Sequence, residues 1–258
     1  MSNNDNLNKA IDSRDDEFYT LREDVDKIMG CLEKYYEKKG IKDVMYIFPA
    51  DTDNSQFVKY AISHCLVYTN FVCIGKEAWI INGQPTKHYA IVTNPPFSKL
   101  RHYFNTVFQI YLDNPFVTFT YIMPTLVSTY KWFEGYLPSF TYYGNMINDK
   151  FFRPDGSIAH VNTIVMSTIY DLDAPMLVPS EEEEPPIDIQ DNKDNFVQKI
   201  RYFYWMINHD KYQKGDTVAL SPNSISFSRW LKKMGWQLIN TQIRIGDKFR
   251  SFEWMKVR

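Results

Sequence analysis

The stretch that decides the fold runs from residue 89 to residue 97 and reads Tyr-Ala-Ile-Val-Thr-Asn-Pro-Pro-Phe. Its first part, Tyr89–Val92, is a short apolar run of the kind that forms a buried strand. Asn94, Pro95 and Pro96 follow, and consecutive prolines cannot extend the hydrogen-bond ladder of a sheet. The segment therefore predicts a buried strand that ends in a rigid turn.

Similar apolar runs alternate with amphipathic segments on both sides of this strand. The spacing predicts helices over 21–39, 55–64 and 100–112. Strands are expected over residues 44–48, 89–92 and 116–123 and within 65–74, and residues 158–170 are rich in strand-forming residues. Strands that alternate with helices form βαβ units, so we expect an α/β fold whose mainly parallel sheet has helices on both faces.

The composition is that of a folded protein. The 258 residues are 44% hydrophobic, which suffices for one sizeable core. Cys31, Cys65 and Cys73 show no paired or metal-ligand spacing and favour a reducing compartment. The polar segment Met1–Ile11 is not a signal peptide, and no apolar run approaches the roughly 20 residues that span a bilayer. We therefore expect a cytoplasmic protein without a membrane partner.

The formal net charge of −2 hides two oppositely charged parts. Residues 1–191 carry a net charge of −10, whereas residues 192–258 carry +8. A basic C-terminal part on an acidic body favours contact with a polyanion such as nucleic acid. A solvated basic surface on an ordinary domain is the alternative.

A change of composition separates these two parts. Residues 174–192 contain four prolines and the acidic run Glu181–Glu184, without helical or strand periodicity. Such a segment is typical of a stiff, extended linker, although a solvated loop within one domain has the same composition. We divide the chain into a flexible N-terminal tail (1–15), an α/β domain (16–173), the linker (174–192) and a basic C-terminal module (193–258).

The C-terminal module is expected to be a small α+β unit. Helices are predicted over 196–208 and 224–234, followed by strands over 237–245 and 248–257 that form a hairpin. This order resembles a winged-helix DNA-binding module; an extension that packs on the main domain is the alternative. The side chains expected to contact DNA phosphates are Arg229, Lys232, Lys233, Arg244, Lys248 and Arg250.

The turn after Val92 carries the groups of a binding site for a planar amine. Asn94 offers a side-chain carbonyl, and the backbone carbonyls at Pro95 and Pro96 have no competing N–H on the same residue. Phe97 offers a flat aromatic face for stacking. In an α/β sheet, ligands bind at the carboxyl ends of the strands, where this turn is expected.

This Asn-Pro-Pro-Phe turn matches the (D/N)PP(Y/F) motif of amino methyltransferases, and its context resembles the EcoRI-type adenine-specific DNA methyltransferases of the gamma class. Two further segments support the resemblance. Glu17–Thr20 is similar to the N-terminal cofactor motif of that family, and Phe151–Ser157 is similar to a downstream family segment. The three segments occur in the family's order, and the resemblance covers residues 15 to 173.

The resemblance implies a Rossmann-like class I methyltransferase sheet and methyl transfer from S-adenosylmethionine to N6 of a flipped-out adenine in double-stranded DNA. The catalytic residues that it implies are Asn94, Pro95, Pro96 and Phe97. The cofactor-binding residues are Phe18, Tyr19, Thr20, Phe48, Pro49, Ala50, Asp51 and Asn94. It further implies a monomer or weak dimer in the cytoplasm of a bacterial or phage-infected cell.

Other residues carry weaker signals. An aromatic stretch, expected either to border the base pocket or to fill the core, comprises Tyr130, Trp132, Phe133, Tyr136, Tyr142 and Tyr143. The histidines lack ligand spacing, so no metal site is expected. They are His64, His88, His102, His160 and His209.

The sequence departs from the family at the cofactor loop. Residues 48–55 contain no glycine, whereas many relatives are glycine-rich there, and the second strand ends at Thr69-Asn70 without the usual acidic residue. The alternative is therefore a catalytically degenerate methyltransferase-like protein that binds DNA or a protein. A methyltransferase acting on RNA or on a protein amide is a third hypothesis.

Overall fold

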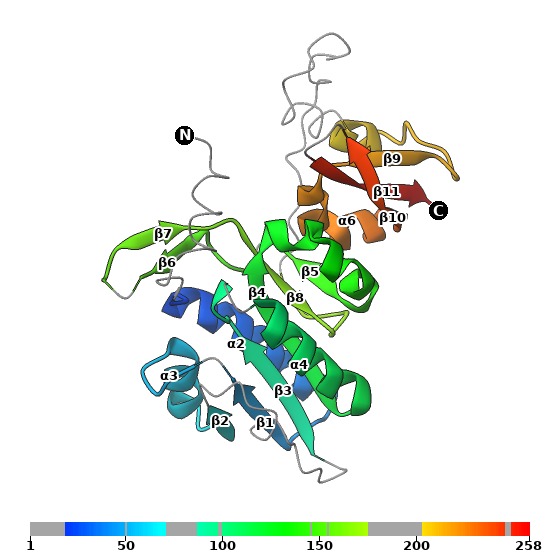
Figure 1. Ribbon diagram of the computed structural model, residues 1–258. Helices are drawn as coiled ribbons and strands as arrows, with labels where there is room; N and C mark the ends of the chain where they lie inside the picture. The colour runs from blue at the N-terminus through cyan, green and yellow to red at the C-terminus, as the bar shows by residue number, and fades with distance from the viewer. Residues whose placement is uncertain are drawn as a thin grey trace.

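The computed structural model describes residues 19–49, 51–70, 87–97, 100–144, 146–153, 155–174, 203–245 and 249–258. Its largest feature is a six-stranded sheet with the order β2-β1-β3-β4-β8-β5 (Figure 1). The strands are β1 (Val44–Phe48), β2 (Tyr68–Asn70), β3 (His88–Thr93), β4 (Val117–Pro124), β5 (Thr141–Tyr143) and β8 (Thr163–Ser167). The α/β fold with a mostly parallel sheet is confirmed.

Strand β8 is the exception to the parallel arrangement. It pairs antiparallel with both β4 and β5. Parallel neighbours need a long crossover, usually a helix, but the chain between β5 and β8 forms only the hairpin of β6 (Lys150–Phe152) and β7 (Ile158–His160). The stretch 158–170, expected to be rich in strand, forms the two strands β7 and β8, which belong to different sheets.

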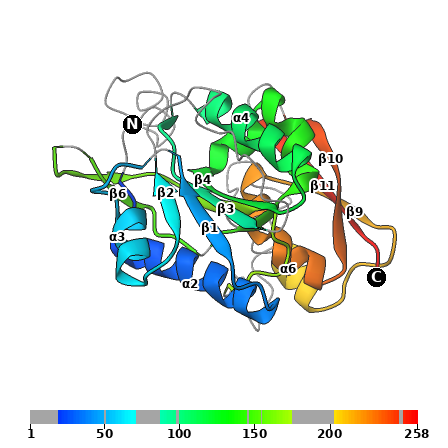
Figure 2. The ribbon, with the colours of Figure 1, turned by 90° about the horizontal axis from the view of Figure 1, so that it is seen from below.

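Helices cover both faces of the sheet (Figure 2). One face carries α2 (Arg22–Lys38) and α3 (Gln56–Ser63), and the other carries α4 (Leu100–Asp113). Side chains of β4 alternate between the two faces, as strand geometry requires. Thr118 is hydrogen-bonded to the Tyr36 hydroxyl of α2, whereas Phe119 and Tyr121 pack against Phe104 of α4.

The C-terminal residues form a second sheet with the antiparallel order β10-β11-β9. Its strands are β9 (Thr217–Leu220), β10 (Trp236–Ile245) and β11 (Phe249–Lys256). Residues 203–208 are helical, and the short 3-10 helix η5 (Pro222–Phe227) precedes α6 (Ser228–Lys233). One cluster of buried side chains runs from the large sheet into this unit. The expected helix over 224–234 is thus a 3-10 turn followed by a shorter α-helix.

The C-terminal unit is packed directly onto the edge of the large sheet. The Arg229 guanidinium lies 5.3 Å from the ring centroid of Tyr143 and donates a hydrogen bond of 3.0 Å to the carbonyl of Ala174. At a second contact, Thr241 Oγ1 donates to Glu134 Oε1 at 2.8 Å. These contacts join α6 and β10 to the α/β part of the chain.

Gly144, directly after β5, permits the close approach of η5. A Cβ at this position would lie 2.7 Å from the Cβ of Ser226 and 2.9 Å from its carbonyl oxygen. Backbone cannot yield as a flexible side chain can, so Gly144→Ala is expected to lower the free energy of unfolding by about 1–3 kcal/mol. Urea denaturation followed by circular dichroism measures this change.

The matched control for this prediction is Gly30→Ala in α2. No atom lies within 4 Å of a Cβ at Gly30, and alanine in a helix is more stable than glycine by about 0.5–1 kcal/mol. The two identical chemical changes should therefore shift stability in opposite directions. An unchanged urea midpoint for Gly144→Ala would show that the two units are not tightly packed at this point.

Candidate functional site

The Asn94-Pro95-Pro96-Phe97 turn lies at the carboxyl end of β3, with β1 and β4 on either side. Asn94 Nδ2 donates a hydrogen bond of 2.9 Å to Oγ1 of Thr20, just before α2. Thr20 is buried, whereas Tyr19 is 45% exposed. The structure therefore brings together two of the segments singled out from the sequence, and Thr20 fixes the orientation of the Asn94 amide.

The loop after β1 contributes a buried carboxyl group next to this turn. Phe48 and Pro49 are buried, and Asp51 Oδ2 is inaccessible to solvent without a hydrogen-bond partner among the described residues. Burial raises the pKa of Asp51 to about 7, and a hydrogen bond with Ser55 offsets part of this effect. A buried carboxyl oxygen of this kind suits a cationic ligand group, because an opposite charge favours the ionised form.

Asn70, at the end of β2, closes the same loop and was not singled out from the sequence as a site residue. Its Nδ2 donates to the carbonyl of Asp51 at 3.3 Å and to Asp53 Oδ1 at 2.9 Å. Only the pairing of β2 with β1, which sets Asn70 opposite Phe48, brings it to the loop.

The loop of residues 48–55 needs no glycine for its backbone conformation. None of its described residues has a positive φ, so none needs the left-handed conformation that favours glycine. Ser55 caps α3 by accepting a hydrogen bond of 3.2 Å from the backbone N–H of Val58. The departure from the family pattern is therefore compatible with an ordered loop.

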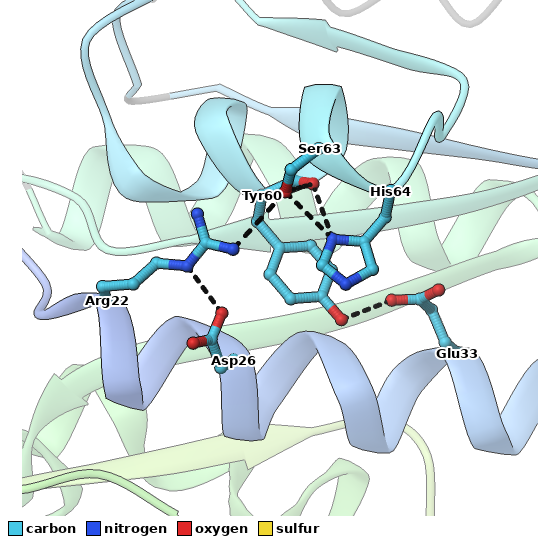
Figure 3. A network of polar contacts seen from close by, with 6 residues as sticks. All are labelled: Arg22, Asp26, Glu33, Tyr60, Ser63 and His64. Carbon is cyan, nitrogen blue, oxygen red and sulfur yellow. Dashed lines mark hydrogen bonds and ion pairs between the residues drawn. The ribbon is translucent and has the colours of Figure 1, made fainter.

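A network of polar contacts fixes α2 against α3 behind this loop (Figure 3). The Tyr60 hydroxyl donates to Glu33 Oε1 at 2.6 Å, and the His64 ring stacks on Tyr60 at 3.9 Å. Arg22 Nε donates to Asp26 Oδ1 at 2.6 Å, and Arg22 also reaches Ser63. Because α2 follows Thr20 and α3 follows Ser55, the network holds two walls of the site in place.

Phe97 belongs to the wall of a pocket of about 160 Å³. The pocket is lined by Phe97, Leu100, Arg101, Pro124, Val127, Tyr130 and Trp132. The Arg101 guanidinium lies 5.9 Å from the Trp132 ring centroid, within the range of a cation–π contact. Aromatic walls of this kind suit a flat ring that stacks on them.

The aromatic stretch divides between this pocket and the core. Tyr130 and Trp132 line the pocket, whereas Phe133, Tyr142 and Tyr143 are buried in the core. Tyr136 is half-buried and donates to Asn105 Oδ1 at 3.0 Å. Arg101 was missed from the sequence; its position four residues after Phe97, in the first turn of α4, is the signal that could have identified it.

The basic residues of α6 do not share one open surface. Arg229 contacts Tyr143 and Ala174, and Lys232 Nζ lies 5.6 Å from the Tyr170 ring centroid. Burial lowers the pKa of Lys232. Lys233 is exposed, as expected for a residue that contacts phosphate. Two of the three predicted α6 contacts therefore face the α/β part of the chain.

The remaining predicted residues are described in part or not at all. Arg244 and Arg250 are paired across β10 and β11, so both lie at the end of the hairpin where β10 turns into β11. Phe18, Ala50 and Lys248 lie outside the described residues, as do the tail and residues 175–202, which include most of the predicted linker.

Two further classes of feature are missing from the part of the chain that the structure describes. Its residues include no group of three or more His, Cys, Asp or Glu side chains placed to hold a metal ion. None of its helices is long and apolar enough to cross a membrane.

Comparison with known proteins adds no relative to this picture: no family model, curated protein or solved structure matches the chain.

Proposed function

We propose that this protein is an S-adenosylmethionine-dependent DNA methyltransferase that modifies N6 of adenine. The observation that carries the proposal is the position of the Asn94–Phe97 turn. It lies at the carboxyl end of a central parallel strand, with Phe97 on the wall of an aromatic pocket. This combination offers acceptors for an amine beside a surface for a flat ring.

The topology of both sheets supports the proposal. The mostly parallel sheet of order β2-β1-β3-β4-β8-β5, with helices on both faces, is compatible with the Rossmann-like sheet that the resemblance implies. In the C-terminal unit, helix, β9, η5, α6, β10 and β11 follow one another. Helices followed by a two-stranded hairpin are the elements on which the resemblance to a winged-helix module rests.

The residues at the ends of β1 and β2 fit the cofactor, whose methionine part carries an ammonium group. The buried Oδ2 of Asp51 would pair with that ammonium, and Phe48 with Pro49 would form an apolar wall. Thr20 contacts the Asn94 turn through its hydrogen bond with the Asn94 amide. When bound, S-adenosylmethionine supplies an electrophilic methyl group on a sulfonium.

The chain's own residues would activate the acceptor amine by orienting it. The exocyclic amine of adenine is a poor nucleophile because its lone pair is delocalised into the ring. With the Asn94 amide held by Thr20, its carbonyl oxygen and the backbone carbonyl of Pro95 would accept the two amine hydrogens. Phe97 would stack on the base, which must leave the duplex to reach the pocket. Positioning and charge stabilisation then supply the acceleration, without a covalent enzyme intermediate.

The second candidate is a catalytically degenerate relative that binds DNA without turnover. The glycine-free loop of residues 48–55 favours it. Thermal melting separates the two, because a ligand that binds only the folded state raises the melting temperature. A competent enzyme is stabilised by S-adenosylmethionine, and a protein that has lost the cofactor site is not.

The direct test is transfer of labelled methyl groups from S-adenosylmethionine to unmodified genomic DNA, followed by nucleoside analysis. We expect labelled N6-methyladenine. Label in N4-methylcytosine would show methyl transfer to DNA with cytosine as the target base. Label confined to RNA or protein would show that the methyl acceptor belongs to another substrate class. No label in any acceptor, with the protein folded, would refute the proposed activity.

A further inference from the structure

The hairpin of β6 and β7 forms an arm that projects from the body of the protein (Figures 1 and 2). Its two strands pair only with each other, apart from an isolated bridge between Phe152 and Tyr19. This bridge has two backbone hydrogen bonds, from Tyr19 N to Phe152 O at 2.8 Å and from Phe152 N to Tyr19 O at 3.1 Å. Tyr19 is therefore joined to the edge of the arm by a single-residue bridge.

The two faces of the arm differ. Phe151 and Ala159 are opposite each other and buried, so this face packs against the protein. Phe152 and Ile158 form the next pair and are 45% and 54% exposed. Because directly opposed residues share a face, Tyr19, Phe152 and Ile158 form one exposed apolar row across the arm and the residue bridged to it. We name these three residues the apolar row.

Cationic side chains flank this row. Lys150 and Arg153 are exposed and make no ion pair with the described residues. The two nearby acidic residues are engaged within the arm: Asp149 Oδ2 is 3.2 Å from His160 Nδ1, and Asp155 Oδ1 accepts a hydrogen bond of 2.8 Å from the N–H of Ser157. The arm thus presents an apolar centre together with two exposed cations that lie outside any ion pair with the described residues.

The apolar row is continuous with the candidate site. Tyr19 precedes Thr20, and Thr20 Oγ1 accepts the hydrogen bond from Asn94. Tyr19 therefore links the apolar row directly to the residue that holds the Asn94 amide.

We propose that the arm is a DNA-contacting surface, in which the apolar row packs against unstacked bases next to the target while Lys150 and Arg153 contact the phosphates. This inference rests on the proposed function. Apolar side chains that insert beside a base step offset the cost of unstacking, and exposed cations attract the phosphate backbone. A duplex from which a base has been flipped offers both an apolar gap and phosphates on either side of it.

The test measures binding of a fluorescein-labelled duplex of mixed sequence by fluorescence anisotropy at several salt concentrations. We expect Phe152→Ala and Ile158→Ala each to weaken binding by about tenfold without changing its salt dependence, because they remove apolar contact with the bases and no charge. We expect Lys150→Gln combined with Arg153→Gln to reduce the slope of log affinity against log salt by about 2, since two phosphate contacts are lost.

The matched control is Leu112→Ala, at the C-terminal end of α4 and outside the arm. Leu112 is also a large, exposed apolar residue, at 60%, and its removal should leave DNA binding unchanged. An unchanged melting temperature and an unchanged S-adenosylmethionine-dependent melting shift show that each variant keeps its fold and its cofactor site.

The outcomes separate this inference from the proposed function. Wild-type protein that binds DNA through the arm without transferring methyl groups supports the inference and refutes the activity. Wild-type protein that methylates DNA while Phe152→Ala binds as tightly as wild type refutes the inference alone. Loss of self-association in the arm variants with unchanged DNA affinity also refutes it, because the arm would then join two copies of the chain. A wild-type protein that does not bind DNA refutes both.

Discussion

Asn94→Ala is expected to reduce methyl transfer to DNA by at least about 100-fold, the cost of removing one well-placed polar group from a transition state. The side chain is small and lies in a turn at the end of β3, so the fold of the sheet does not depend on it. Quantification of labelled N6-methyladenine under single-turnover conditions measures the effect. The melting temperature should stay close to that of the wild-type protein.

Substitutions of Thr20 provide the matched control for Asn94, because Thr20 acts through the Asn94 amide and is a positioning residue. Thr20→Val keeps the size of the side chain and removes the acceptor for Asn94 Nδ2, whereas Thr20→Ser keeps that acceptor. We expect Thr20→Val to lower kcat with little change in the KM for DNA, and Thr20→Ser to restore most of it. Full activity of Asn94→Ala would remove Asn94 from the mechanism.

Asp51→Asn is expected to stabilise the cofactor-free protein at pH 8 and to abolish its stabilisation by S-adenosylmethionine. Burial raises the pKa of Asp51 from 3.8 to about 7, so keeping the ionised form in the folded protein costs free energy above that pH. The shift corresponds to a cost of the order of 4 kcal/mol, since one pKa unit is about 1.4 kcal/mol. The amide has the same shape and no charge to bury.

The pH dependence follows from the sign of this shift. A raised pKa means that the folded state holds the proton more tightly, so the contribution of Asp51 to stability is complete below about pH 4 and is lost as the pH rises through 7. The stability difference between Asp51→Asn and the wild type should therefore be small at pH 4 and reach its maximum at pH 8. Urea denaturation across this range, without cofactor, measures it.

Asp53→Asn is the control for this pH effect, because Asp53 is in the same loop and has an exposed side chain. It should not gain stability between pH 4 and pH 8. A constant difference between Asp51→Asn and the wild type across this range would contradict the burial of the Asp51 carboxyl group.

The elements predicted from the sequence are those determined by local pattern. The buried strand of residues 89–92 and its Asn-Pro-Pro turn, the helix over 21–39 and the two strands that end the chain are all present with small changes at their ends. Their signals, apolar runs bounded by breakers and regular helical spacing, lie within a few residues of each other and need no knowledge of the tertiary fold.

The features that could not be predicted depend on contacts between distant residues. Asn70 reaches the loop of Asp51 only because β2 pairs with β1. Strand β8 is antiparallel to β5 because the chain between them forms the hairpin of β6 and β7 in place of a crossover helix. The sequence placed Arg229 and Lys232 on a predicted helix, but it could not show that they face Tyr143 and Tyr170. An amphipathic pattern identifies a buried face without naming its partner.

The tight contact between Gly144 and Ser226 has a mechanical consequence. With η5 set against β5 at this point, the C-terminal unit is packed directly against the edge of the large sheet. On the proposed function, we expect a duplex that contacts the Asn94 turn and the C-terminal unit at once to bend to fit this arrangement. Its flexibility at the base steps between the two contacts would then contribute to the choice of site.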